Sequence, residues 1–234
     1  MKTIHVLENL IPYTMIKREN RFVVSVKDSM GDTQPAHLTN TGRLLDLIIP
    51  GNPCLCIPKT PGKTKIRLVG IPISQSMSIL IDPGEQSRSF VKAVKMSLIP
   101  WLKGWKIKRP EIQYEESRVD FQIESDSGEI GYIEVKSAGM LLEKKIGSFP
   151  DCPTTRGQKH VRTMQKIAKR NHRSIILFLV QHPDAESFSP NKEGDPEFAR
   201  LLKNASEQGV EVRAIKMNLQ TDGNVVLADP DLPC

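Results

Sequence analysis

Hydrophobic and polar residues alternate in short runs along the first 82 residues of the chain. The runs lie at 21–28, 54–58, 65–73 and 77–82. Alternation with a period of two is typical of strands that bury one face, and short strands between frequent turns favour a small closed barrel or a sandwich. We therefore predict that residues 1–82 form an all-β unit.

From about residue 85 the pattern changes to helices that alternate with strands. The segments 87–102 and 155–171 place apolar residues at helical spacing. A further helix is predicted between Asp195, which suits an N-cap, and Gly209, which suits the C-terminal stop. Helix–strand alternation of this kind predicts a mixed sheet flanked by helices, which we assign to residues 83–234.

One stretch, SRVDFQIESDSGEIGYIEVKS, alternates like a β-hairpin. Its simplest turn is centred on Ser127 and has Gly128 at the position that requires positive φ. Pairing about Ser127 places Asp120 opposite Glu134, and Lys136 follows on the same face. The opposite face, which we expect to be buried, consists of Val119, Phe121, Ile123, Ile133 and Val135.

The polar face of this hairpin has two interpretations. It can be a solvated face, as most charged strand faces are. However, directly opposed carboxylates destabilise a sheet unless a cation or a proton lies between them. A hard divalent ion such as Mg²⁺ or Mn²⁺ favours this arrangement, so Asp120 and Glu134 are candidate metal ligands of a phosphodiester-cleaving site. Lys136 would orient the attacking water or stabilise charge in the transition state.

Basic residues are concentrated in two stretches. Residues 88–109 and 155–173 each hold seven Lys or Arg and no acid, whereas the rest of the chain has 19 basic and 27 acidic residues. This segregation indicates a polyanionic partner, with a merely solvated face as the alternative.

The helix predicted at 155–171 would present the second basic stretch to DNA phosphates. Gln158 near its start would contact the metal-bound water or the substrate, or would be a plain surface residue. We expect His160 and His172 to lie on the surface. The predicted nucleic-acid contacts on this helix are Arg156, Lys159, Arg162, Lys166 and Arg170.

Composition narrows the class of protein further. The chain has 234 residues, of which 38% are hydrophobic and 26% charged, as in an ordinary globular protein. We find no apolar run long enough to span a membrane and no secretory signal, and therefore expect a cytoplasmic protein. Four scattered cysteines suit neither a disulfide framework nor a zinc site.

Several motifs together resemble the sugar fermentation stimulation protein A family. They are RFVVSV and HLTNTGRL in the first half, and SRVDF, YIEVKS, FPDCPTTRGQKH, DPEFARLL and GVEVRAIK in the second. The resemblance extends from about residue 18 to 217. It implies an N-terminal OB-like barrel and a C-terminal restriction-endonuclease-like domain of the PD-(D/E)XK type, in a family whose members are described as DNA-binding.

Matched by position, the resemblance makes Asp120 and Glu134 the metal-binding acids, Lys136 the motif lysine and Gln158 the glutamine found in related nucleases. It also singles out His37, Asn40 and Gly42, which either contact the nucleic acid or only form a turn. The chain departs from many nucleases of this fold because the segment 87–102 contains no acid. Glu85, Glu115 and Glu116 lie nearby, but none matches the missing position clearly.

Two functions remain open from the sequence. The first is a Mg²⁺- or Mn²⁺-dependent deoxyribonuclease, which the joint presence of Asp120, Glu134 and Lys136 favours. The second is a non-catalytic DNA-binding regulator of sugar-metabolism genes on a nuclease-like fold. The absent helix acid favours this second function.

Overall fold

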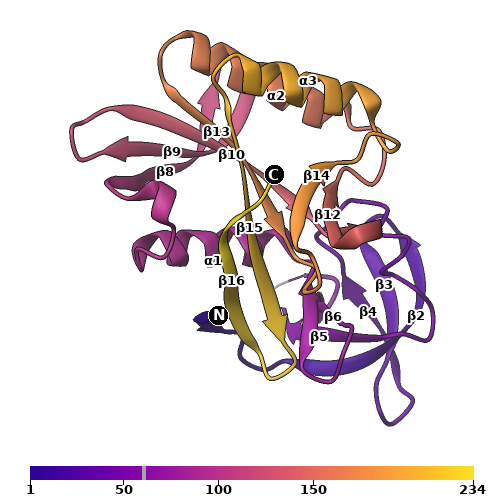
Figure 1. Ribbon diagram of the computed structural model, residues 1–234. Coiled ribbons are helices and arrows are strands. Elements are labelled where there is room, and N and C mark those ends of the chain that lie inside the picture. Colours follow the sequence, from indigo (N-terminus) through magenta and orange to yellow (C-terminus); the bar gives the residue numbers. More distant parts are fainter. Residues whose placement is uncertain (60–61) are drawn as a thin grey trace.

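The computed structural model describes residues 1–59 and 62–234. The chain forms a barrel unit and a larger unit built on a mixed sheet, which are joined through shared strand pairing (Figure 1). No helix in these two ranges is both long enough and apolar enough to cross a membrane.

In the described part of the chain, five strands close into the barrel. They are β2 (Ile11–Asn20), β3 (Val23–Lys27), β4 (Thr33–His37), β5 (Pro53–Pro58) and β6 (Ile66–Pro72). Antiparallel pairs join β3 to β2 and β4, and β5 to β2 and β6, and a parallel pair between β4 and β6 closes the ring. Alternate residues such as Val24, Val26 and Leu68 fill the interior. The predicted small barrel is confirmed.

The larger unit is a mixed sheet. Its strands are β7 (Met77–Leu80), β8 (Trp105–Tyr114), β9 (Ser117–Ser125), β10 (Ile130–Ala138), β13 (Arg173–Val180), β15 (Glu211–Gln220) and β16 (Asn224–Leu232). The strand order β7-β15-β13-β10-β9-β8 continues the barrel sheet through the β6–β7 pair. A separate small sheet contains β11 (Met140–Leu142), β12 (Ile146–Phe149) and β14 (Ser187–Pro190).

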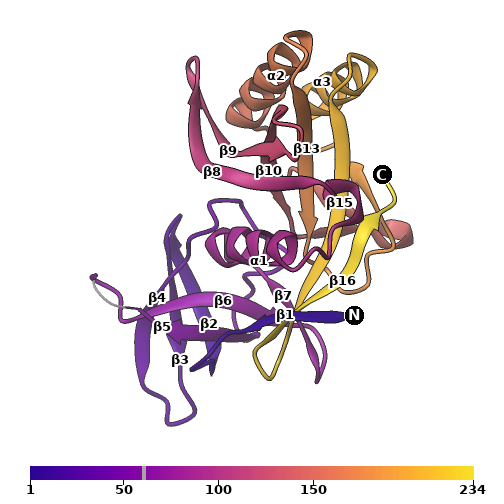
Figure 2. The same ribbon diagram turned by 90° about the vertical axis from the view of Figure 1, so that its left-hand side faces the viewer.

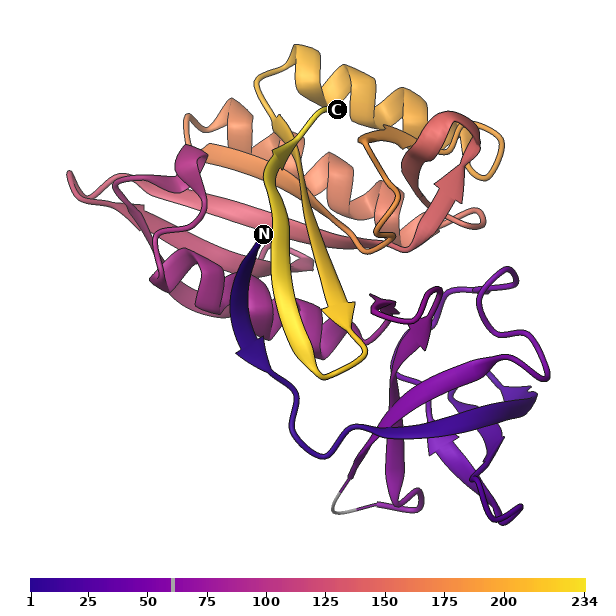
Figure 3. The ribbon, with the colours of Figure 1, turned by 60° about the horizontal axis from the view of Figure 1, so that its bottom comes forward.

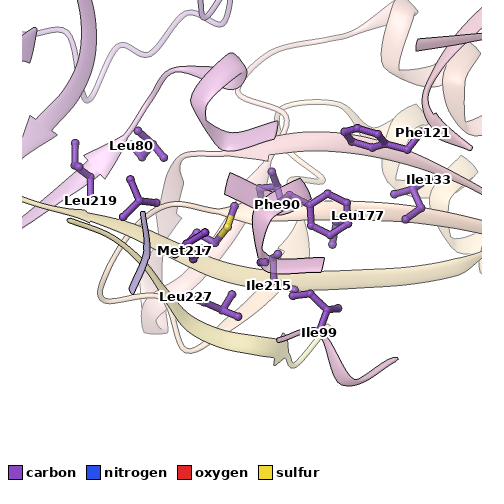
Figure 4. Packing of buried hydrophobic residues seen from close by; sticks show 14 of the residues in the cluster. Leu80, Phe90, Ile99, Phe121, Ile133, Leu177, Ile215, Met217, Leu219 and Leu227 are labelled. Atoms are coloured by element: carbon purple, nitrogen blue, oxygen red, sulfur yellow. The ribbon is translucent and has the colours of Figure 1, made fainter. Parts of the chain in front are cut away.

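Helices cover both faces of the mixed sheet. Figure 2 shows α1 (Pro83–Lys95) on one face and α2 (Thr155–Lys169) with α3 (Pro196–Glu207) on the other. On the α1 face, Phe90 contacts Phe121 of β9 with ring centroids 5.7 Å apart, within a cluster that also buries Ile133 and Leu177 (Figure 4). Each such side chain contributes about 1.5–3 kcal/mol when it is fully buried. Because both faces are covered, the middle of β10 is shielded from solvent.

The helix starts follow local signals, but one helix end does not match the prediction. The Asp195 side chain accepts the Phe198 N–H at 2.9 Å, so it caps α3 as predicted. The helix predicted over 87–102 instead ends at Lys95, because Ser97 has a φ of 56° and Pro100 opens a separate 3₁₀ turn.

The first strand also differs from the predicted division at residue 82. β1 (Lys2–Val6) pairs with β16, and Ile4 is buried in the core of the larger unit (Figure 3). The start of the chain therefore belongs with the unit at 83–234 and not with the barrel. The boundary itself coincides with the N-cap of α1, where the Asp82 side chain accepts the Glu85 N–H at 2.8 Å.

Candidate carboxylate and metal site

The β9–β10 hairpin has the register that the sequence predicts. Phe121 pairs with Ile133, and Gly128 in the turn has a φ of 87°. The next positions along the two strands are Asp120 and Glu134. Tyr132 packs in the cluster under α2 while Ile133 packs in the cluster under α1, so Glu134 points toward α2.

Glu134 lies in a buried ion network. It is 2% exposed, and its Oε1 contacts both Lys136 Nζ and Nδ1 of His160 from α2. Burial alone would raise the pKa of this carboxyl, but Lys136 and His160 together hold the pKa below its ordinary value. The other oxygen, Oε2, is buried and has no hydrogen-bond partner among the described residues.

Asp120 completes a pair of carboxylates. Its Oδ2 accepts the Val135 N–H at 2.7 Å, which ties β9 to β10 beyond the Phe121–Ile133 pair. Burial, and then the negative charge of Glu134, raise the pKa of Asp120 to about 6. The protein therefore carries a pair of acids, one half-buried and one buried, whose pKa values are shifted in opposite directions.

This donor set fits a hard divalent cation. A buried carboxylate oxygen without a hydrogen-bond donor is costly unless a cation or a proton meets it. Within residues 1–59 and 62–234, no three His, Cys, Asp or Glu side chains form a ready-made metal cluster. Asp120 and Glu134 would thus supply two ligands and leave the other positions to water, backbone carbonyl or phosphate oxygens, as Mg²⁺ commonly does.

His160 is part of this site, and the prediction that it lies on the surface is wrong. It is 8% exposed, and Lys136 Nζ lies 3.4 Å from its Nδ1. The sequence did contain a signal for this burial. His160 stands four residues before Met164 and seven before Ile167, so it belongs to the apolar stripe of the helix.

Gln158 is placed close to the start of α3. Its amide nitrogen donates to both carboxylate oxygens of Asp195 at 3.1 Å. This contact ties the first turn of α2 to the cap of α3. A role of Gln158 toward substrate or metal-bound water stays a prediction.

The basic residues of the stretch 155–173, which covers α2 and the start of β13, are largely paired with acids that come from other segments. Lys166 and Arg170 both contact Glu115, at 2.8 Å each. The other pairs are Lys159 with Glu116, Arg162 with Glu197 and Arg173 with Glu211. A stretch that contains no acid in the sequence is therefore not an unbalanced positive surface in the folded protein.

The residues singled out in the barrel have structural contacts. Asn40 donates to the Ile81 carbonyl at 3.1 Å and accepts the Gly42 N–H at 3.0 Å, as expected for a turn. His37 lies in β4, half-buried, and burial lowers its pKa. Binding roles for His37 and Asn40 stay predictions.

Glu85, Glu115 and Glu116, the candidates for the additional acid that the segment 87–102 lacks, each contact basic residues. Glu85 contacts Arg67 at 2.7 Å and also contacts Arg88. Glu115 and Glu116 bind the basic residues of α2. Each of these three acids therefore has a basic partner away from Asp120.

A cleft of about 660 Å³ lies between the barrel and the larger unit. The loop 40–47 forms one wall, and residues of the small sheet and the loop before α2 form the other. Its lining includes Ser137, which follows Lys136 in β10, and Thr154, the N-cap of α2. The cleft therefore reaches the end of β10 and the start of α2, while Asp120 and Glu134 are not part of its lining.

A closed five-stranded barrel, followed by a mixed sheet whose hairpin carries Asp, Glu and Lys, defines an OB domain joined to a restriction-endonuclease-like domain. Residues 16–81 match the family model for the SfsA N-terminal OB domain, and residues 85–223 match the model for the sugar fermentation stimulation protein RE domain. The chain belongs to the sugar fermentation stimulation protein family.

Relatives of the chain match nearly its whole length. A sugar fermentation stimulation protein homolog of Pyrococcus furiosus is 39% identical and covers 93% of each chain. A homolog of Archaeoglobus fulgidus is also 39% identical and covers 97% of this chain and 96% of its own. A solved structure of Pyrococcus furiosus SfsA in complex with Ca²⁺ superimposes with a TM-score of 0.94 at 35% identity, and covers 100% of this chain and 99% of that one.

Proposed function

We propose that the protein is a phosphodiesterase that cleaves DNA with Mg²⁺ or Mn²⁺ as its cofactor. The observation that carries this proposal is the buried Oε2 of Glu134, which has no partner among the described residues and lies beside Asp120, whose own pKa is raised to about 6. The solved relative from Pyrococcus furiosus, which was determined in complex with Ca²⁺, supports cation binding in this family.

In this proposal Asp120 and Glu134 hold the ion. When bound, the ion would lower the pKa of a coordinated water and withdraw charge from the scissile phosphate. Lys136 and His160 hold Oε1 of Glu134, which leaves Oε2 for the ion. Lys136 would also stabilise negative charge that develops on the phosphate, and Gln158 would position the substrate.

The predicted DNA contacts on α2 remain part of the proposal. Exposed ion pairs such as Lys166–Glu115 contribute little to stability, so phosphate groups can replace their acidic partners at small cost. Arg156 is exposed at the first turn of α2. His37 and Asn40 would contact DNA from the barrel.

One observation favours a second function, that of a non-catalytic DNA-binding regulator of sugar-metabolism genes. The segment 87–102 has no acid, and Glu85 at the start of α1 is engaged by Arg67 and Arg88. A site with two carboxylates can hold an ion without completing turnover. The experiment below separates the two functions.

The test is cleavage of labelled single-stranded and duplex DNA with Mn²⁺ or Mg²⁺, with the wild type beside Asp120→Asn and Glu134→Gln. We expect each substitution to lower the cleavage rate by at least about 100-fold, because each removes a ligand of the ion. Glu124→Gln is the matched control. Glu124 lies on the same strand as Asp120 but contacts Lys108 on the surface, so cleavage should be unchanged.

Thermal unfolding with and without Mn²⁺ provides a second readout that does not require turnover. A saturating ligand at about 100 times its Kd stabilises a protein by about 2.7 kcal/mol. Mn²⁺ stabilisation that is lost in Asp120→Asn, together with no cleavage by the wild type, would select the regulator. Cleavage that survives in both variants would overturn the proposed site.

A further inference from the structure

We propose that the tip of the β2–β3 hairpin is a stacking platform that holds a single-stranded segment of nucleic acid at the rim of the interdomain cleft. The residues are Phe22, Arg21 and Arg43. This inference rests on the proposed function for the identity of the polymer, and it specifies which form of DNA the protein takes and where.

Phe22 is an aromatic residue held out into solvent by a fixed backbone. Its side chain is 49% exposed, and it occupies the two-residue turn between β2 and β3 together with Arg21. Its N–H donates to Asn20 Oδ1 at 2.8 Å, and its carbonyl accepts the Leu38 N–H at 2.8 Å. Because both backbone groups are bound, the direction in which the Phe22 side chain leaves the turn is fixed.

Arg18 fixes this turn against the loop that forms the cleft wall. Its guanidinium donates to the carbonyls of Asn20 at 3.3 Å, Arg21 at 3.4 Å and Gly42 at 2.9 Å, and also to the carbonyl of Arg43. Through these bonds Arg18 acts as a positioning residue that holds the hairpin tip against the 40–47 loop. Arg21 and Arg43 consequently project from neighbouring backbone segments.

Arg21 and Arg43 are two arginines without an ion-pair partner in the part of the chain that the structure describes. Both are exposed and both line the cleft. Within residues 1–59 and 62–234, neither has an acidic side chain within ion-pair distance, in contrast to the paired bases of α2. The Arg21 guanidinium lies 5.8 Å from the Phe22 ring centroid, so a cation and an aromatic face are presented together.

The cleft also contains two acids, which limit where a phosphate can enter. Asp46 and Asp151 are both part of the lining. Asp151 is already used, because its Oδ2 accepts the Leu44 N–H at 3.0 Å. The phosphates of a bound strand would therefore follow Arg21 and Arg43 rather than the carboxylates.

This combination of groups selects single strands. The face of a base is available to an aromatic side chain only when the base is not stacked within a duplex, and guanidinium groups bind the phosphates on either side. A strand seated on Phe22 would run along the cleft wall toward Ser137, the residue after Lys136 in β10, and Thr154, the N-cap of α2. We therefore expect single-stranded DNA or a single-stranded overhang to bind in preference to a blunt duplex.

Fluorescence anisotropy with a labelled oligonucleotide of about 15 nucleotides, close to the upper site size of one OB domain, tests this platform. Binding is measured in Ca²⁺ or without metal, so that no cleavage is required. Phe22→Ala should weaken binding about 5- to 150-fold, which corresponds to the loss of one stacked base. Phe22→Trp should retain affinity, whereas Phe22→Leu, which is apolar but has no aromatic face, should lose it as Phe22→Ala does.

The two arginines have a separate readout. For single strands the logarithm of affinity falls with the logarithm of salt concentration by about 0.7 for each phosphate contacted, so Arg21→Ala with Arg43→Ala should reduce this slope by about 1.4. Lys192→Ala with Lys203→Ala is the matched control, because it removes the same charge from two exposed positions outside the cleft, one before α3 and one within it. Its slope should equal that of the wild type.

The outcomes separate this inference from the proposed function. Wild-type affinity and slope in the Phe22 and arginine variants, in a protein that still cleaves DNA through Asp120, would overturn the platform and leave the nuclease intact. Equal binding of blunt duplex and single strand with no effect of Phe22→Leu would do the same. A wild type that binds no DNA would overturn both.

Discussion

Two glutamates each hold two basic side chains, but they differ in their surroundings. Glu134 lies in the middle of the sheet with Lys136 and His160 and is 2% exposed. Glu115 lies in the exposed turn between β8 and β9 and binds Lys166 and Arg170 on the surface. Both oxygens of Glu115 are bound, whereas Glu134 keeps Oε2 without a partner in the described residues. A glutamate that contacts two basic side chains is thus fully paired at the surface, in the case of Glu115. In the case of Glu134 it is buried and has one oxygen without a partner in the described residues.

Glu85 shows that burial alone does not leave an oxygen free. It is 5% exposed, and its Oε1 contacts Arg67 and Arg88 while its Oε2 accepts from Arg88 Nε at 3.0 Å. A buried carboxylate in this protein can therefore have both oxygens satisfied. Among the described residues, the free Oε2 of Glu134 distinguishes this carboxylate from Glu85, whose two oxygens both accept hydrogen bonds.

We expect the largest change in the free energy of unfolding for Glu134→Gln, measured in the metal-free protein. The substitution leaves Lys136, whose side chain is 11% exposed, without its ion-pair partner at position 134. Breaking a buried pair in this way should lower the free energy of unfolding by about 3 kcal/mol. Urea denaturation followed by circular dichroism measures the change.

Glu115→Gln is the matched control for this measurement. It removes one negative charge from a glutamate that also contacts two basic side chains, but on the surface. The urea midpoint should therefore remain that of the wild type. Equal destabilisation by the two substitutions would contradict the distinction between the two regions. Because Glu134→Gln also weakens the fold, Asp120→Asn is the cleaner variant for cleavage assays.

The sequence was sufficient where structure depends on neighbouring residues. Alternation and one turn glycine determined that Phe121 pairs with Ile133, and an Asp-Pro pair located the start of α3. It was not sufficient where distant segments meet. The pairing of β1 with β16 and the contact of Glu115 with Lys166 depend on how the whole sheet folds. A count of charges along the chain therefore overestimated the positive surface of α2.

A second test concerns Glu85 and the dependence of stability on pH. Burial alone would raise the pKa of this carboxyl, but hydrogen bonds and charge from Arg88 and Arg67 hold it below its ordinary value. A depressed pKa in the folded state contributes stability that is present above the unfolded-state pKa, at about 4.3, and lost as pH falls through the folded-state value.

Glu85→Gln should therefore lower the free energy of unfolding by about 2 kcal/mol at neutral pH, as for hydrogen bonds to a charged group. The difference between variant and wild type should shrink as the pH falls below the ordinary range of a carboxyl group. Urea denaturation at a series of pH values measures it. A difference that stays constant down to the acid transition would show that the carboxylate charge is not what Arg67 and Arg88 require.

We expect the smallest effect for substitutions of the basic residues on and next to α2, measured as the affinity for DNA. Lys166 and Arg170 share Glu115, so replacing both bases also leaves the Glu115 carboxylate without its partners. Its repulsion of DNA phosphates is weak, because the carboxylate is exposed and salt screens its charge. Lys166→Ala with Arg170→Ala should weaken single-strand binding by less than about 3-fold, and should change the salt slope less than Arg21→Ala with Arg43→Ala does. Anisotropy titrations of both double variants over the same salt series make the comparison. A larger loss on α2 than at the hairpin tip would place the main phosphate contacts on the helix, where the sequence first indicated them, and would show that the Glu115 pairs exchange freely for DNA.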